Sequence, residues 1–203
     1  FLIIGMDSFS DQFEKRNWAE VSAKINSTTS KNIERALEGA GEGGMDDLAA
    51  LLSPLANKEY LEDMAQLANQ LTMQRFGKAI RLFAPIYLSN ECNNVCDYCG
   101  FSMGNDIARK TLSPAEILRE IGILRKLQFD HVLLVTGESS QKVGVDYLYD
   151  SISVLNEYFS NVSMEVQPLK SDEYGYLISA GLHAVLVYQE TYEKKSYSKH
   201  HIV

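Results

Sequence analysis

Four short apolar runs, separated by segments of helical period, constrain the second half of this 203-residue chain more than any other feature. The runs are rich in branched and aromatic residues, as buried strands are. The segments between them carry apolar side chains every three or four positions, which is typical of amphipathic helices. Strands are predicted over 82–88, 131–135, 162–166 and 184–188, and helices over 113–127, 147–158 and 172–180. Strands that alternate with helices indicate βαβ units and a parallel sheet.

Four such strands, with the sequence ending soon after the fourth, fit the first half of a (β/α)8 barrel of the TIM type. A doubly wound parallel sheet is the structural alternative. Residues 1–80 instead show successive helical patterns, for example the stripe of Trp18, Val21 and Ile25. We therefore predict an α/β fold with two regions, a helical N-terminal region over 1–80 and a half barrel over 81–203.

The segment Ser113–Glu116 gives a sharp local prediction. Its Ser-Pro-Ala-Glu sequence is a capping box with proline at the first helical position, so a helix should begin at Pro114. Four apolar side chains of this helix should face the core. They are Ile117, Ile121, Leu124 and Leu127.

Composition excludes several classes of protein. Acidic residues outnumber basic ones 27 to 19, for a formal net charge of −8, whereas a protein that binds the phosphate backbone of nucleic acids needs the opposite sign. No apolar run approaches the roughly 20 residues of a membrane helix, and Phe1–Ile4 is too short for a secretory signal. We expect a cytoplasmic protein that binds neither nucleic acid nor membrane.

Both ends of the sequence are abrupt, and the second end suggests a piece of a longer protein. The first methionine is Met6, and the five residues before it read as stray apolar sequence, so translation is expected to start at Met6. The sequence stops at Val203 without a capped helix or a polar tail. Because half a barrel leaves a strand edge unpaired and one side open, we expect this chain on its own to be an inactive fragment.

All three cysteines lie in one short stretch. Cys92, Cys96 and Cys99 have C-x3-C-x2-C spacing and follow the first predicted strand, where the βα loops of a barrel form its active site. In a cytosolic protein such clustering favours a metal over disulfides. A [4Fe–4S] cluster usually takes four cysteines, so three would leave one iron open to a substrate or cofactor.

A zinc site is the main alternative, since structural zinc also takes thiolate ligands. It would need a fourth ligand, and no further cysteine or histidine lies near the three in the sequence. A zinc-stabilised binding module without catalysis is therefore the rival class of function. Free thiols that cluster by coincidence are a further alternative.

The cysteine motif, with an aromatic residue (Tyr98) before its last cysteine, resembles the signature of the radical S-adenosylmethionine (SAM) enzymes. The wider segment Tyr87–Ser102 is similar to the aromatic-amino-acid lyases of that family, most closely the tyrosine lyases of thiamin thiazole synthesis. The tyrosine lyases of hydrogenase maturation share the cysteine loop, but Glu165–Pro168 favours the thiamin branch. Six further segments fit this resemblance: Phe9–Asp11, Glu34–Leu37, Arg109–Leu112, Leu133–Glu138, Met164–Leu169 and Tyr188–Tyr192.

The resemblance implies a [4Fe–4S] cluster on Cys92, Cys96 and Cys99, with an open iron that chelates the amino and carboxylate groups of SAM. One electron would cleave SAM to methionine and a 5′-deoxyadenosyl radical, which abstracts hydrogen from L-tyrosine. Cleavage of the Cα–Cβ bond of tyrosine then gives 2-iminoacetate (dehydroglycine) and 4-cresol. The implied partners are a thiazole synthase subunit and a flavodoxin- or ferredoxin-like electron donor, which NADPH could drive.

The resemblance also assigns contacts with SAM. Gly137 and Glu138 match a Gly-Glu motif that binds the amino group, and Glu190 matches an acid that binds the ribose hydroxyls. Tyr98 is expected near adenine, mainly through its backbone. From the residues alone, Glu138 is an ordinary loop acid and Glu190 could equally cap a helix.

Two further groups of polar residues lie later in the chain than the cysteine motif. Glu165 and Gln167 alternate with apolar neighbours and could point into the barrel mouth, either as site residues or as a polar layer of the barrel. His200 and His201 could titrate near neutrality, but nothing around them in the sequence predicts a role.

Overall fold

The computed structural model describes residues 8–202, so the predicted start at Met6 lies outside the described residues. The chain divides into two compact units, Phe1–Ile80 and Arg81–Val203. Each unit has a hydrophobic core of its own.

The described part of the N-terminal unit consists of short helices around a small core. This core contains Ile33, Ala36, Ala50 and Ala56. The helices are α1 (Phe9–Glu14), α2 (Trp18–Asn26), α3 (Ser30–Glu38), α4 (Met45–Leu51), α5 (Pro54–Glu59) and α6 (Leu61–Phe76).

The amphipathic stripe predicted at Trp18 forms a helix face, but this face is not buried. Helix α2 has no buried residue, and Trp18 and Val21 are 50% and 37% exposed. The indole of Trp18 packs instead on the ring of Phe13, with centroids 4.7 Å apart. A helical period shows which side chains share a face, but it does not show whether another element covers that face.

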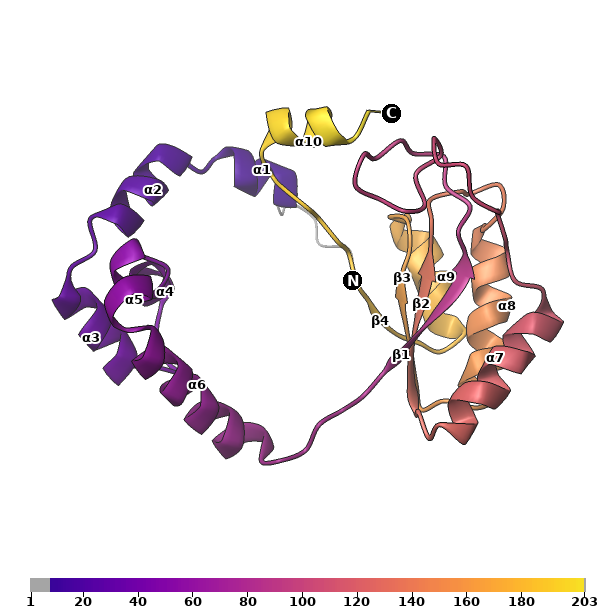
Figure 1. Ribbon diagram of the computed structural model, residues 1–203, viewed down its shortest axis with the longest axis horizontal. Helices are drawn as coiled ribbons and strands as arrows, with labels where there is room; N and C mark the ends of the chain where they lie inside the picture. Colours follow the sequence, from indigo (N-terminus) through magenta and orange to yellow (C-terminus); the bar gives the residue numbers. More distant parts are fainter. Residues whose placement is uncertain (1–7, 203) are drawn as a thin grey trace. The chain divides into compact units, whose positions relative to one another are not determined.

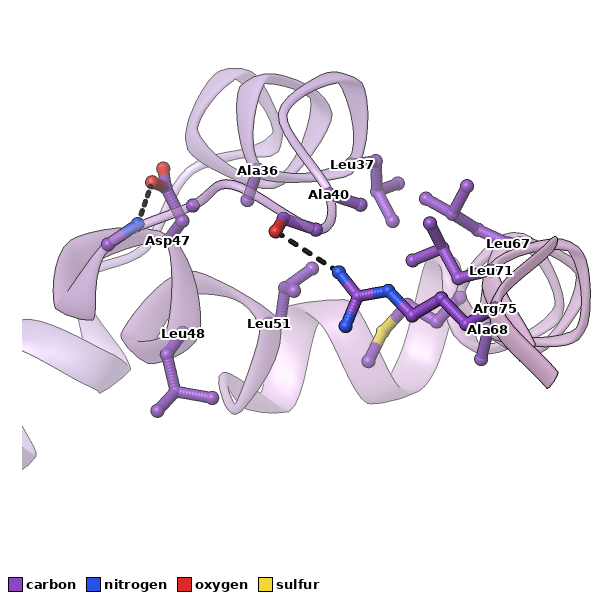
Figure 2. A pocket seen from close by; sticks show the side chains of 14 residues that line it. Ala36, Leu37, Ala40, Asp47, Leu48, Leu51, Leu67, Ala68, Leu71 and Arg75 are labelled. Carbon is purple, nitrogen blue, oxygen red and sulfur yellow. Dashed lines mark hydrogen bonds between the residues drawn. The ribbon is translucent and has the colours of Figure 1, made fainter.

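A cavity of about 450 Å³ opens among α3, α4 and α6 (Figure 2). Leucine and alanine side chains form most of its wall, and Arg75 reaches across it to donate to the carbonyl of Gly41 at 3.5 Å. None of the predicted site residues lines this cavity. It is a largely apolar hollow of the helical unit.

The C-terminal unit is a parallel sheet in which strands follow one another in chain order (Figure 1). The strands are β1 (Ala84–Ser89), β2 (His131–Thr136), β3 (Asn161–Glu165) and β4 (Leu182–Val185). The helices are α7 (Pro114–Lys126), α8 (Val145–Asn156), α9 (Ser171–Ser179) and α10 (Lys194–His200). The α/β fold of βαβ units is confirmed. The sequential strand order is that of a barrel, because the order of a doubly wound sheet reverses at a switch point.

Alternation along the strands decides which face of the sheet packs against α7, α8 and α9. Side chains from all four strands lie in one core with residues of these helices, and the strand members are Ile86, Leu88, Val132, Leu134, Val162, Met164 and Leu182. Tyr87, between two of these, is 56% exposed on the other face. The sheet therefore buries one face under helices, as the wall of a barrel does.

Helix α7 confirms most of its prediction. The backbone N–H and the hydroxyl of Ser113 both donate to Glu116 Oε2 at 2.8 Å, which forms the predicted capping box. Ile117 and Ile121 are buried, and Leu124 packs against the core. The prediction for Leu127 is wrong: it is 63% exposed, because α7 ends there and the next residue has a φ of 64° that turns the chain away.

Two strand boundaries differ from prediction. The first strand begins at Ala84, and Leu82 and Phe83 before it are exposed. The fourth strand begins at Leu182 and ends three residues earlier than predicted. Its neighbour β3 ends at Glu165, so pairing stops after the N–H of Leu186 donates to the carbonyl of Met164.

Within residues 8–202, no helix is both long and apolar enough to cross a lipid bilayer.

Candidate functional site

The three cysteines lie on the loop between β1 and α7, beyond the carboxyl end of β1. Their thiols are free, and each side chain is partly buried. Burial raises the pKa of Cys96, and negative charge on Cys99 and Cys92 raises it further. Cys92 and Cys99 therefore both lie within electrostatic reach of Cys96.

Among the described residues, no three His, Cys, Asp or Glu side chains are gathered as ligands of a single metal ion. A [4Fe–4S] cluster makes a different demand on its ligands. Each cysteine binds a different iron, so the sulfur atoms surround a whole cluster and stand further apart than the ligands of one ion.

Arg109 joins the two ends of the cysteine loop. Its Nη1 donates to the carbonyls of Asn90 (2.7 Å) and Phe101 (2.8 Å), and its Nη2 to those of Ser102 (2.7 Å) and Asn105 (3.3 Å). Asn90 precedes the first cysteine and the other three follow the last. The planar guanidinium holds several N–H donors in a fixed geometry, so it can reach all four carbonyls at once. The ammonium of a lysine could not reproduce these bonds.

Gly137, just after β2, makes a very close contact with the start of the cysteine loop. Its N–H donates to the carbonyl of Ser89 at 3.1 Å. A Cβ atom at this position would lie 2.4 Å from the carbonyl oxygen of Glu91 and 3.0 Å from Cβ of Cys92. Only glycine permits this approach of two backbones.

Glu138 is exposed and attached to the same loop by two hydrogen bonds. Asn94 Nδ2 donates to Glu138 Oε2 at 2.7 Å, and the N–H of Asn93 donates to the carbonyl of Glu138 at 2.8 Å. These bonds fix the carboxylate beside Cys96, whose pKa its charge also raises.

A cavity of about 310 Å³ lies beside this loop, at the carboxyl ends of β2, β3 and β4, and we call it the edge cavity. The structure brings most of the predicted site residues to its wall. These are Cys96, Tyr98, Cys99, Gly137, Glu138, Glu165, Gln167 and Glu190. Cys92 is not part of the lining and lies against Gly137 instead.

The lining of the edge cavity is acidic. Glu138, Glu165 and Glu190 contribute carboxylates, and its described lining residues include no lysine or arginine. Burial raises the pKa of Tyr98 well above its usual range, and the charge of Glu190 beside it adds to this rise. The phenol of Tyr98 is therefore neutral, and the cavity favours a cationic ligand.

Two oxygen atoms of the lining are buried without a hydrogen-bond partner among the described residues. They are Thr136 Oγ1 and Gln167 Oε1. The amide of Gln167 is oriented by its own Nε2, which donates to the carbonyl of Val143 at 3.0 Å. An unpaired buried polar atom costs about 1–3 kcal/mol, so we expect water or a bound ligand to complete the hydrogen bonds of these two oxygens.

Asn94, Tyr197 and His201 also line the edge cavity, and sequence reasoning gave them no role. Tyr197 and His201 belong to α10 and the residue after it. His201 lies 103 positions from Tyr98, with which it shares a hydrogen bond. Such a contact leaves no local pattern in the sequence.

The sequence-family model for the Radical SAM superfamily matches residues 86–201 of this chain. Over 197 residues the chain is 49% identical to the 2-iminoacetate synthase of Escherichia coli (strain K12) and 47% identical to that of Salmonella typhimurium (strain LT2), and it covers 52% of each. These alignments include 97% of this chain. It is 31% identical over 162 residues to the 3-methylornithine synthase of Methanosarcina acetivorans, aligning 76% of this chain with 44% of that protein. The chain thus spans about half the length of the curated relatives it matches.

Two solved structures are similar to most of this chain. One is HydG, a maturase of the [FeFe]-hydrogenase, with a TM-score of 0.82, 27% identity, and coverage of 91% of this chain and 44% of HydG. The other is methylornithine synthase (PylB), with a TM-score of 0.61, 20% identity, and coverage of 90% of this chain and 50% of PylB. The second similarity concerns the fold alone. Together they confirm the predicted fold class. This chain corresponds to about half the length of each of these barrel enzymes.

The contact at Gly137 gives a prediction about the cysteine loop. Gly137→Ala should displace the loop, because the new Cβ overlaps the carbonyl of Glu91, and should lower the free energy of unfolding by about 1–3 kcal/mol. The thiol of Cys92 should then react faster with a thiol reagent. Gly100→Ala, in the same loop but with no described atom within 4 Å of its Cβ, is the matched control. Equal thiol reactivity in the two variants would contradict the packing described.

Proposed function

Because the chain belongs to the radical SAM superfamily, we propose that Cys92, Cys96 and Cys99 hold a [4Fe–4S] cluster and that the edge cavity binds SAM. The family implies both groups. The observation that supports their place here is the shared cavity, whose wall includes two of the cysteines and the acids Glu138 and Glu190.

The chemistry of these residues fits both groups. Three thiolates satisfy three irons of a cluster and leave the fourth for an outside ligand. SAM carries an ammonium and a sulfonium, and three carboxylates without a lysine or arginine favour such a cation. Thr136 Oγ1 and Gln167 Oε1 offer acceptors that lack a partner among the described residues.

When bound, the cluster and SAM supply a one-electron cleavage that yields methionine and a 5′-deoxyadenosyl radical. The residues of this chain bind and orient. Glu138, held by Asn94, accepts a hydrogen bond from the ammonium of SAM, and Glu190 accepts from the ribose hydroxyls. Tyr98 lies against the adenine. Gly137 brings the loops together closely enough for these contacts to share one cavity.

The reaction that we propose is cleavage of the Cα–Cβ bond of L-tyrosine to 2-iminoacetate and 4-cresol, for the thiazole moiety of thiamin. The identity of 49% to a 2-iminoacetate synthase supports this choice. The hydrogenase maturase HydG, at 27% identity, is the second candidate. The corresponding partners are a thiazole synthase subunit and a flavodoxin- or ferredoxin-like electron donor, which NADPH could drive.

The role of Glu138 is testable by substitution. In the anaerobically reconstituted protein, Glu138→Ala should weaken SAM binding roughly ten- to hundredfold, because a charge-assisted hydrogen bond of about 1.5–3 kcal/mol is lost. Iron content should not change. Equilibrium dialysis measures the affinity, with Glu157→Ala at the end of α8 as the control. Unchanged affinity in Glu138→Ala would make Glu138 an ordinary loop acid.

The identity of the substrate is tested by analysing the reaction products of the protein encoded by the complete reading frame. Anaerobic incubation with tyrosine, SAM and a strong reductant should give 4-cresol and 5′-deoxyadenosine, separated by chromatography. If 5′-deoxyadenosine forms without 4-cresol, the proposed SAM cleavage stands and the proposed tyrosine lyase activity is contradicted. Stoichiometric zinc without iron after anaerobic reconstitution with iron and sulfide, together with no 4-cresol, would favour the rival zinc module without catalysis.

A further inference from the structure

The chain after α10 pairs with the cysteine loop as a short extra strand. The N–H of Asp97 donates to the carbonyl of His200 at 3.2 Å, and the N–H of Ile202 donates to the carbonyl of Val95 at 2.9 Å. Between these bonds, Cys96 and His201 form an antiparallel bridge. The backbone around the second cysteine is therefore supported by a segment distant in the sequence.

The side chain of His201 is oriented by two contacts with Tyr197. Its Nδ1 lies 3.0 Å from the carbonyl oxygen of Tyr197, and its ring stacks on that of Tyr197 with centroids 3.8 Å apart and 7° between the planes. A carbonyl oxygen can only accept, so Nδ1 carries the proton and donates. In the neutral imidazole, Nε2 is then an acceptor.

The free acceptor of His201 points to the hydroxyl of Tyr98. The distance from Nε2 to the hydroxyl oxygen is 2.5 Å, and the two rings meet edge to face, with centroids 5.3 Å apart. Tyr98 stands between the second and third cysteines, and Tyr98, Tyr197 and His201 all line the edge cavity. The hydrogen bond thus fixes the direction of an aromatic ring in the wall of the cavity.

A purely structural role for His201 would be to fasten α10 to the loop. Two backbone hydrogen bonds and one side-chain hydrogen bond already do this, since His200 Nδ1 lies 2.8 Å from Asp97 Oδ2. What only His201 adds is the bond to the Tyr98 hydroxyl. Its distinct contribution is therefore the orientation of the phenol.

We propose that His201 is a positioning residue that holds the Tyr98 ring against the bound SAM, a role that rests on the proposed SAM site. A fixed ring presents its surface to the planar adenine without first losing rotamer freedom. A ring released from His201 would rotate among rotamers, and SAM would have to order it on binding.

The test is a double-mutant cycle on the anaerobically reconstituted protein, built from His201→Phe, Tyr98→Phe and the double variant. His201→Phe keeps a ring to stack on Tyr197 and removes the hydrogen bond. Tyr98→Phe removes the same bond from the other side, together with the hydrogen bond of the phenol with Glu190. Each single variant should bind SAM roughly three- to tenfold more weakly. The double variant should be no weaker than Tyr98→Phe, because Tyr98→Phe already lacks the bond to His201.

Electron paramagnetic resonance of the reduced protein supplies a second readout. The change that SAM produces in the spectrum should be altered alike in both single variants, while iron content stays equal. His183→Phe, the same substitution at an exposed position near the start of β4, is the matched control and should match the unsubstituted protein.

Each outcome decides the proposal. Additive losses in the double variant, or a SAM response in His201→Phe equal to that of the control, would overturn it while leaving the SAM site intact. If His201→Phe does not fold, Tyr98→Phe alone must still show the weaker binding and the altered spectrum, and normal values would overturn the proposal. Failure of the unsubstituted protein to bind SAM would instead overturn the proposed function, and this inference with it.

Discussion

The contact between Gly137 and the start of the cysteine loop is the constraint on which the candidate site depends. Strands β1 and β2 are parallel, and Ser89 pairs with Thr136 at their ends. The two loops that follow must therefore leave the sheet side by side. They approach so closely that a single added methyl group at Gly137 would meet the backbone of Glu91 at 2.4 Å. The cysteines and the Gly-Glu pair share one site because this contact is possible.

Long-range hydrogen bonds then stiffen the cysteine loop from three sides. Arg109 joins its two ends, Asn94 connects it to Glu138, and the segment after α10 pairs with its centre. A loop held in this way needs little rearrangement to accept a ligand, which reduces the entropy lost on binding. In the wall of the edge cavity, by contrast, Thr136 Oγ1 and Gln167 Oε1 have no hydrogen-bond partner among the described residues.

Much of the C-terminal unit could be predicted because its signals are local. The period of two in the strands, the period of three to four in the helices, and the capping box at Ser113 each lie within a few residues. Errors arose where burial depends on distant neighbours. The exposed face of α2 and the early end of β4 follow from which elements are adjacent in space, whereas Leu127 is exposed because α7 ends there.

The candidate site divides in the same way. The cysteine spacing could be read directly, and the resemblance supplied Gly137, Glu138 and Glu190, whose roles remain predictions. Arg109 lay inside a matching segment but had no predicted function, because its four acceptors are backbone carbonyls that any residue provides. His201 was missed because its partner Tyr98 is 103 positions away.

Electron–nuclear double resonance tests the central claim most directly, namely that an iron held by this loop meets SAM in the edge cavity. The reduced, reconstituted protein is measured with SAM labelled with ¹⁵N at its amino group. We predict a ¹⁵N coupling to the cluster, since an iron without a protein ligand is free to bind that nitrogen. A reduced cluster with saturating SAM and no ¹⁵N coupling would contradict the account.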